Sequence, residues 1–145
     1  MSAFDRAALL QGDPVFEHRF TIPFQHVDAA GIVFFARVLD YFHDTYVGFL
    51  AACGHPLPRV LRKGEWAAPL LHCEADYMAP LRFGDSVGCG IVATQWSGSK
   101  LIVGYRLTNG DVPSAVGHTV HLFVDPRDMS RVPPPEDLVA RFTAP

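Results

Sequence analysis

The most constraining feature of the sequence is a long apolar stretch with helical periodicity between Arg37 and Ala52. Its few polar or small positions recur at steps of three and four residues, so on a helix they form one narrow stripe. They are Arg37, Asp40, Asp44 and Gly48. A helix that is apolar around most of its circumference is not a surface helix. We therefore expect a helix over 37–52 that is enclosed by a sheet.

Segments in which apolar and polar residues alternate lie on both sides of this helix, and such alternation predicts strands with one buried face. The first segment runs from Glu17 to Phe24, with its even-numbered residues, Phe24 included, on the buried side. The later segments are 71–78, 87–93, 101–107 and 116–124. Residues 57–65 are expected to form a connection, and residues 136–142 one or two helical turns.

Short turn-forming sequences at 82–85, 97–99 and 109–111 separate the later strands and are short enough for hairpins. The order of one strand, a long buried helix and four strands predicts an α+β protein in which a curved antiparallel sheet of about five strands wraps around a central helix. This arrangement is the hot-dog fold. Because such a sheet has open edges, which proteins usually cover or pair, we expect a homodimer or a homotetramer.

Length and composition suit one soluble domain. The chain has 145 residues, of which 49% are hydrophobic, so we expect a single domain over 1–145 with its core at about 16–125. The net charge of −3 and the scattered basic residues argue against a nucleic-acid partner. No apolar run approaches the ~20 residues of a membrane span, and Asp5 and Arg6 interrupt any signal peptide, so a cytoplasmic protein is expected.

The segment 26–35 combines a carboxylate, small residues and the start of the predicted helix. After Asp28, the small residues Ala29, Ala30 and Gly31 let another molecule approach the backbone closely. The first N–H groups of a helix have no partner within it and lie at the positive end of its dipole, so they can bind a thioester oxygen as it becomes an oxyanion. Asp28 can then attack the thioester carbon or activate a water. The alternative is that Asp28 only forms a turn or caps the helix.

This segment resembles the active-site loop of the 4-hydroxybenzoyl-CoA thioesterase family. The family motif is an Asp followed by a small residue, Ala or Gly, then Gly-(Val/Ile)-Val and an aromatic residue. The residues that match it in order are Asp28, Ala30, Gly31, Ile32, Val33, Phe34 and Phe35. The resemblance implies that Asp28 is the catalytic carboxylate, with Gly31 in the same loop, and that the backbone N–H near Phe35 polarises the thioester carbonyl.

The resemblance extends over about residues 16–125, because 69–77 and 80–85 look like the family's second strand and its Gly-Asp turn. The sequence of residues 40–46, together with His72, is most similar to the 1,4-dihydroxy-2-naphthoyl-CoA thioesterase branch. One departure is Phe35, which stands seven residues beyond the Asp, where many members have a hydrophilic residue, often His. This departure argues against the branch that uses such a histidine with short-chain substrates.

Several side chains are candidates for binding the acyl group. Four aromatic residues are expected to form an apolar pocket, namely Phe34, Phe35, Phe42 and Tyr46. His43 lies on the apolar side of the predicted helix, where it is either an interior or interface histidine or a pocket residue that bonds a ring hydroxyl. His72 shares a strand face with Glu74 and Asp76, for which the other interpretation is a solvated or subunit-contact face.

The predicted turn Ser97-Gly98-Ser99-Lys100 is the candidate for binding CoA. In the resembled family this turn commonly lies beside the CoA phosphates, and backbone N–H groups, hydroxyls and a cation such as Lys100 suit an anion. Without that resemblance the sequence is simply a turn. Arg62 and Arg82 are further candidates for the same role. CoA is then part of the substrate, and no separate cofactor is expected.

The favoured function is an acyl-CoA thioesterase that hydrolyses an aromatic or medium-size acyl thioester to the free acid and CoA, with Asp28 as nucleophile or general base. One alternative is a hydratase or dehydratase of the same fold, which needs His26 and Asp28 to converge on the acyl chain. Another is a domain that binds an acyl-CoA or an acyl carrier without hydrolysing it. The spacings of His26, His118 and His121 match no known metal cluster, so no metal site is expected.

Overall fold

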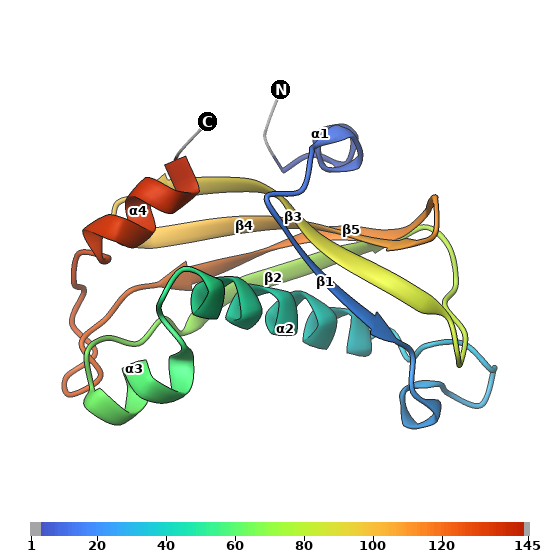
Figure 1. The fold of residues 1–145 in the computed structure, drawn as a ribbon, viewed down its shortest axis with the longest axis horizontal. Coiled ribbons are helices and arrows are strands. Elements are labelled where there is room, and N and C mark those ends of the chain that lie inside the picture. Colours follow the sequence, from blue (N-terminus) through green and yellow to red (C-terminus); the bar gives the residue numbers. More distant parts are fainter. Residues whose placement is uncertain (1–3, 144–145) are drawn as a thin grey trace.

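The computed structural model of the protein describes residues 4–143, and its centre is an antiparallel sheet of five strands (Figure 1). The strands are β1 (Phe16–Thr21), β2 (Leu70–Tyr77), β3 (Ser86–Ser97), β4 (Lys100–Asn109) and β5 (Val112–Leu122). Their order across the sheet is β1-β3-β4-β5-β2, and every neighbouring pair is antiparallel. The predicted α+β class and the antiparallel sheet are confirmed.

Helix α2 (Arg37–Ala52) lies along one face of this sheet and has the predicted boundaries. Its buried residues are Val38, Tyr41, Phe42, Thr45, Tyr46, Phe49 and Leu50. Side chains on the other side of the helix, such as those of His43 and Asp44, are exposed. The predicted arrangement of a sheet around a long central helix is confirmed, and Asp40 and Asp44 of the predicted polar stripe lie on the exposed side of α2.

The other helices are short. Helix α3 (Leu57–Lys63) lies where a connection was predicted over 57–65. Pro58 fits the first turn of this helix, where a missing N–H loses no helical hydrogen bond. Gly64, with a φ of 66°, ends the helix. Helix α1 (Arg6–Gln11), which was not predicted from the sequence, packs on β4 and β5 on the sheet face opposite α2. Helix α4 (Glu136–Thr143) packs against β3. No helix among residues 4–143 is long and apolar enough to span a membrane.

The predicted strands and turns differ from the structure in several places. The first strand ends at Thr21, because Pro23 cannot donate to a sheet ladder, and Phe24, expected to be buried, is 70% exposed in a 3₁₀ turn. Strand β5 begins at Val112 rather than at Val116 and ends at Leu122. The sequence 82–85 does not form a hairpin, because β2 pairs with β5 at the sheet edge and is not a neighbour of β3.

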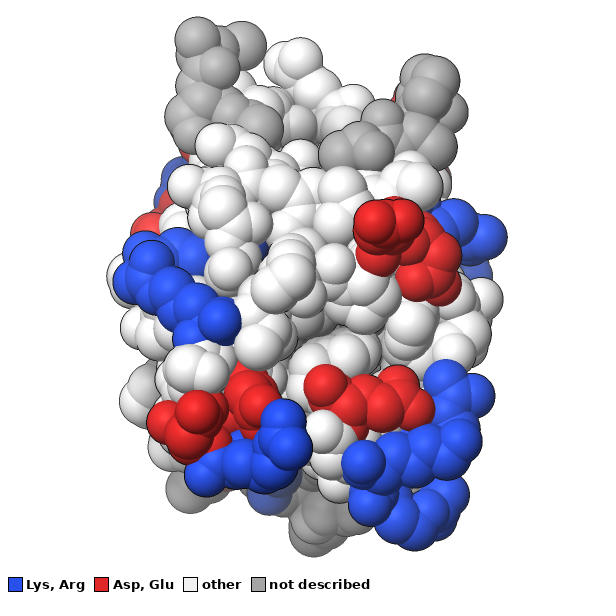
Figure 2. All heavy atoms as spheres, turned by 90° about the vertical axis from the view of Figure 1, so that its left-hand side faces the viewer, with Lys and Arg blue, Asp and Glu red and all other residues white. Residues whose placement is uncertain are grey.

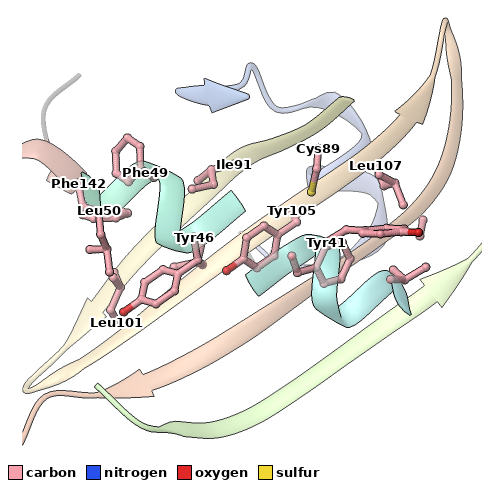
Figure 3. Packing of buried hydrophobic residues seen from close by; sticks show 14 of the residues in the cluster. Tyr41, Tyr46, Phe49, Leu50, Cys89, Ile91, Leu101, Tyr105, Leu107 and Phe142 are labelled. Carbon is pink, nitrogen blue, oxygen red and sulfur yellow. The ribbon is translucent and has the colours of Figure 1, made fainter. Parts of the chain in front are cut away.

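The core fills the space between α2 and the sheet (Figure 3). Phe42 of α2 stacks on Tyr105 of β4, with ring centroids 4.7 Å apart and 6° between the ring planes. Tyr46, one turn further along α2, stacks on His121 at 3.9 Å, and burial lowers the pKa of His121 to about 4. Gly117 of β5 permits the close approach of the Phe42 ring to the sheet, because a Cβ at this position would collide with that ring and with the backbone of β2. These contacts fix the position of α2 and of its N-terminal end.

Candidate functional site

The loop between the 3₁₀ turn (Phe24–His26) and α2 holds Asp28 in a tight, hydrogen-bonded turn. The Asp28 N–H donates to Ile32 O at 2.8 Å, and the Gly31 N–H donates to Asp28 O at 3.0 Å. Asp28 Oδ1 accepts the Ala30 N–H at 2.9 Å. Gly31 has a φ of 82°, a conformation that favours glycine. Asp28 is thus a turn residue, but it is exposed, and its second carboxylate oxygen accepts no hydrogen bond within the described chain.

Two free backbone N–H groups mark the end of this loop. The Phe34 N–H donates to His26 O at 2.9 Å, which folds residues 26–34 back on themselves. The N–H groups of Phe35 and Ala36 donate to no acceptor within residues 4–143, and they lie at the positive end of the α2 dipole. We call Asp28 and these two N–H groups the loop site. It combines a carboxylate with donors for a developing oxyanion.

Exposed aromatic surface surrounds the loop site. The side chains of Phe34, Phe35 and Tyr77 are 45%, 63% and 48% exposed. The Tyr77 hydroxyl donates to Phe35 O at 2.7 Å and ties the end of β2 to the start of α2. An open hollow of about 380 Å³ adjoins this contact, and it is lined by Ile32, Tyr77, Met78, Ala79 and Pro80. Tyr77 was not predicted as a site residue, because alternation identifies a strand but not its position beside α2.

The four aromatic residues predicted to form one acyl pocket do not form it within a single chain. Phe34 and Phe35 are exposed beside the loop site, whereas Phe42 and Tyr46 belong to the core and are 0% and 1% exposed. His43 is exposed rather than interior, and it borders a separate pocket of about 260 Å³. The other residues that line this pocket are Tyr46, Leu57, Leu61, Ala67, Ala68, Pro69 and Met129.

His72 lies on the face of β2 that points away from α2. Ala75 points from β2 toward the core, and Cys73, which is half-buried, shares its side of the strand. His72 and Glu74 point to the opposite side, where both are exposed. Within one chain, therefore, His72 does not meet the loop site.

The predicted CoA-binding turn also lies away from Asp28. Ser97, Ser99 and Lys100 occupy the β3–β4 turn, at the opposite end of the molecule from the loop that carries Asp28 (Figure 1). Figure 2 looks onto the end of the molecule with this turn, where uncharged residues cover the middle and charged side chains of both signs lie around it. A groove of about 370 Å³ adjoins the turn, lined by Trp96, Gly98, Pro133, Pro134, Glu136 and Val139. Arg62 and Arg82 are exposed on α3 and in the turn before β3.

His26 is directed to Tyr41 rather than to Asp28. Its Nδ1 lies 2.9 Å from the Tyr41 hydroxyl oxygen, and burial raises the pKa of Tyr41 to about 12, which keeps this hydroxyl neutral. In the part of the chain that the structure describes, Asp28 pairs with no histidine. The histidine–carboxylate pair that a hydratase needs is therefore not formed among these residues.

Comparison of the sequence with known proteins identifies its relatives. Residues 22–142 match the thioesterase-like superfamily, a range that includes the whole loop site. A 1,4-dihydroxy-2-naphthoyl-CoA hydrolase of Synechococcus elongatus is 33% identical over 124 residues, which cover 85% of this chain and 91% of that protein. A hydrolase of the same name from Nostoc punctiforme is 29% identical, over 86% of this chain and 84% of its own.

Solved structures share the architecture. A 1,4-dihydroxy-2-naphthoyl-CoA thioesterase from Synechocystis matches with a TM-score of 0.81 at 23% identity, over 88% of this chain and 94% of that one. A gentisyl-coenzyme A thioesterase matches with a TM-score of 0.76 at 22% identity, over 87% and 98%. These likenesses confirm the predicted hot-dog fold. From the matched range and the 33% identity it follows that the chain belongs to the thioesterase-like superfamily.

Proposed function

We propose that this protein is an acyl-CoA thioesterase, which uses water to convert an acyl-CoA to the free acid and CoA. The observation that carries the proposal is the loop site, where the exposed carboxylate of Asp28 and the free N–H groups of Phe35 and Ala36 share one short loop. The two N–H groups bind the thioester oxygen as negative charge develops on it. Asp28 attacks the carbonyl carbon or takes a proton from the attacking water.

The turn role of Asp28 supports its catalytic role in this proposal. The bond from the Ala30 N–H to Oδ1 holds the carboxylate in one orientation, and the other oxygen is open to the reacting group. No Lys or Arg side chain within residues 4–143 forms an ion pair with Asp28. The carboxylate is therefore available to a nucleophilic or basic role without first breaking an ion pair.

We propose an aromatic acyl group as the substrate class. Two of the relatives, by their names, act on 1,4-dihydroxy-2-naphthoyl-CoA and gentisyl-CoA, both with aromatic acyl groups. In this chain the exposed rings of Phe34 and Phe35 lie beside the free N–H groups, where they can stack on an aromatic acyl group.

A panel of acyl-CoA substrates tests the proposed function, with the released CoA thiol as readout. Hydroxylated aryl-CoA substrates are expected to give a kcat/KM at least tenfold above that of a long-chain fatty acyl-CoA, because the exposed rings of Phe34 and Phe35 can stack on an aromatic acyl group but not on an alkyl chain. A preference for the fatty acyl-CoA would contradict the aromatic substrate class. Absence of thiol release from every substrate would contradict hydrolysis itself.

A second copy of the chain completes the site in this proposal. Because the loop site and the β3–β4 turn lie at opposite ends of one chain, a CoA bound at Asp28 is expected to meet Ser97, Ser99 and Lys100 of another copy. The outer edge of β2 has no strand partner in the described sheet, and Leu70 and Leu71 on it are 52% and 50% exposed. Such an edge suits pairing with a second copy.

Sedimentation velocity at micromolar concentration is expected to show a dimer or a tetramer. Leu71→Lys at the β2 edge is expected to shift the distribution toward smaller species, because it adds a charge to the proposed contact. Val15→Lys is the matched control, since Val15 is 66% exposed and directly precedes β1, the strand at the opposite edge of the sheet. A monomer with full activity, or equal shifts with both variants, would count against pairing through β2.

A further inference from the structure

We propose that His72, Glu74 and His118 form a binding site for a divalent transition-metal ion, with Zn²⁺ the ion that they fit best. The cluster joins the edge strand β2 to its neighbour β5. Glu74 and His118 are direct partners in the β2–β5 register, and His72 lies two residues before Glu74, on the same strand face. Each residue offers one ligand atom, and the three atoms all lie within 4.8 Å of one another.

The distances within the cluster suit tetrahedral coordination. His72 Nε2 and His118 Nε2 each lie 3.2 Å from Glu74 Oε1. In a tetrahedral zinc site with metal–ligand distances of roughly 2.0–2.1 Å, neighbouring ligand atoms are about 3.3 Å apart. The two imidazole rings have centroids 5.3 Å apart and a tilt of 32°, and both direct a nitrogen to the same carboxylate oxygen. Rotation of the exposed His72 side chain can bring the remaining pair of ligand atoms together.

The ligand types select the class of ion. Imidazole nitrogen suits Zn²⁺, Cu²⁺ and Ni²⁺, whereas Mg²⁺ and Ca²⁺ prefer oxygen ligands only. Three protein ligands leave a fourth position for water. Asp76, the next residue on this strand face, forms an ion pair with Arg6 of α1, in which Arg6 Nε lies 3.4 Å from Asp76 Oδ2. Asp76 thus offsets the positive charge that Arg6 brings near the cluster. The cluster offers two nitrogens and one carboxylate oxygen, with His72 and Glu74 exposed, His118 half-buried, and backbone positions set by two paired strands.

The cluster is separate from the proposed hydrolytic site. It lies on the sheet face opposite α2, away from the loop site, so the proposal does not depend on the proposed hydrolysis. An ion here cross-links β2, the strand at the open edge, to β5. No metal site was expected from the spacings of His26, His118 and His121; the strand register places His118 beside Glu74 instead.

Isothermal titration of tag-free, chelator-treated protein with ZnCl₂ at neutral pH tests the site. One Zn²⁺ per chain is expected to bind with a micromolar or lower Kd and to raise Tm, because an ion that binds only the folded state stabilises it. His72→Asn and His118→Asn each remove one imidazole and keep a polar side chain, and each is expected to weaken binding at least tenfold. His18→Asn is the matched control, a histidine of β1 outside the cluster, and is expected to keep the wild-type Kd.

Two results would overturn this site. One is wild-type protein that shows no Zn²⁺ binding at micromolar concentrations. The other is Zn²⁺ binding that is unchanged in both His72→Asn and His118→Asn, because the ion would then be held elsewhere. Thiol release from acyl-CoA is measured separately on the same variants, and His118→Asn is expected to keep the wild-type rate. Loss of Zn²⁺ binding with unchanged thiol release then distinguishes the metal site from the proposed hydrolysis.

Discussion

Asp28→Asn is expected to lower kcat by roughly 10²-fold or more, while KM and Tm stay close to those of the wild type. The substitution keeps the size of the side chain and an acceptor oxygen, so the turn bond from the Ala30 N–H can persist. It removes the negative charge that attacks the thioester or takes the proton from water. The binding of the acyl-CoA depends on other groups, which is why KM should change little.

Turnover and thermal midpoint measured on the same preparation separate this effect from loss of structure. Asp13→Asn is the matched control, because Asp13 is also exposed and lies outside the loop site, and it should keep both values. If Asp28 were only a turn residue, its substitution would cost at most ~1–2 kcal/mol of stability and would leave turnover intact. Wild-type turnover in Asp28→Asn refutes the catalytic role.

Phe42→Ala is expected to lower the free energy of unfolding by about 3–5 kcal/mol. Phe42 is 0% exposed, stacks on Tyr105 and fills the space that Gly117 leaves open on β5, so its removal leaves a cavity between α2 and the sheet. A loss of this size is a large share of the roughly 5–15 kcal/mol that stabilise an ordinary domain. Urea unfolding followed by circular dichroism measures it.

Phe24→Ala provides the comparison for Phe42→Ala, because Phe24 is the same residue type but 70% exposed. Its substitution is expected to change the free energy of unfolding by about 0.5 kcal/mol or less. Equal losses for the two variants would mean that α2 is not held on the sheet by this stacked pair. The position of the helix end beside Asp28 would then depend on other contacts.

The fold was predictable where local patterns carry it. The helix over 37–52 was predicted with its observed boundaries, because its apolar periodicity is long and Gly54 and Pro56 follow its end. The exposure of Phe24 was not predicted, since alternation continues past Pro23 although the strand does not. Helix α3 was missed because its Pro58 and short length suggest a connection. The pairing of β2 with β5 depends on sheet order, which no local pattern encodes.

The candidate site, too, was predictable only where its residues are close together in the sequence. Asp28, Gly31 and Phe35 belong to one loop, so their neighbourhood follows from the sequence, and the structure adds the free N–H groups. The predicted acyl pocket mixed exposed Phe34, which lies in the loop before α2, with buried Phe42, because the sequence shows that both are aromatic but not which of them the sheet covers. The contact of Tyr77 with Phe35 joins residues 42 positions apart and required the three-dimensional arrangement.

The most direct test of the proposed hydrolysis is to measure both products formed from a hydroxylated aryl-CoA by the wild-type protein and by Asp28→Asn. The CoA thiol is followed by a thiol reagent and the aromatic acid by chromatography. The wild type is expected to release thiol and acid in a ratio of one to one over many turnovers, and Asp28→Asn to release both roughly 10²-fold more slowly. Tight binding of the aryl-CoA by the wild type without release of either product would contradict the proposed thioesterase and would favour a domain that only binds acyl-CoA.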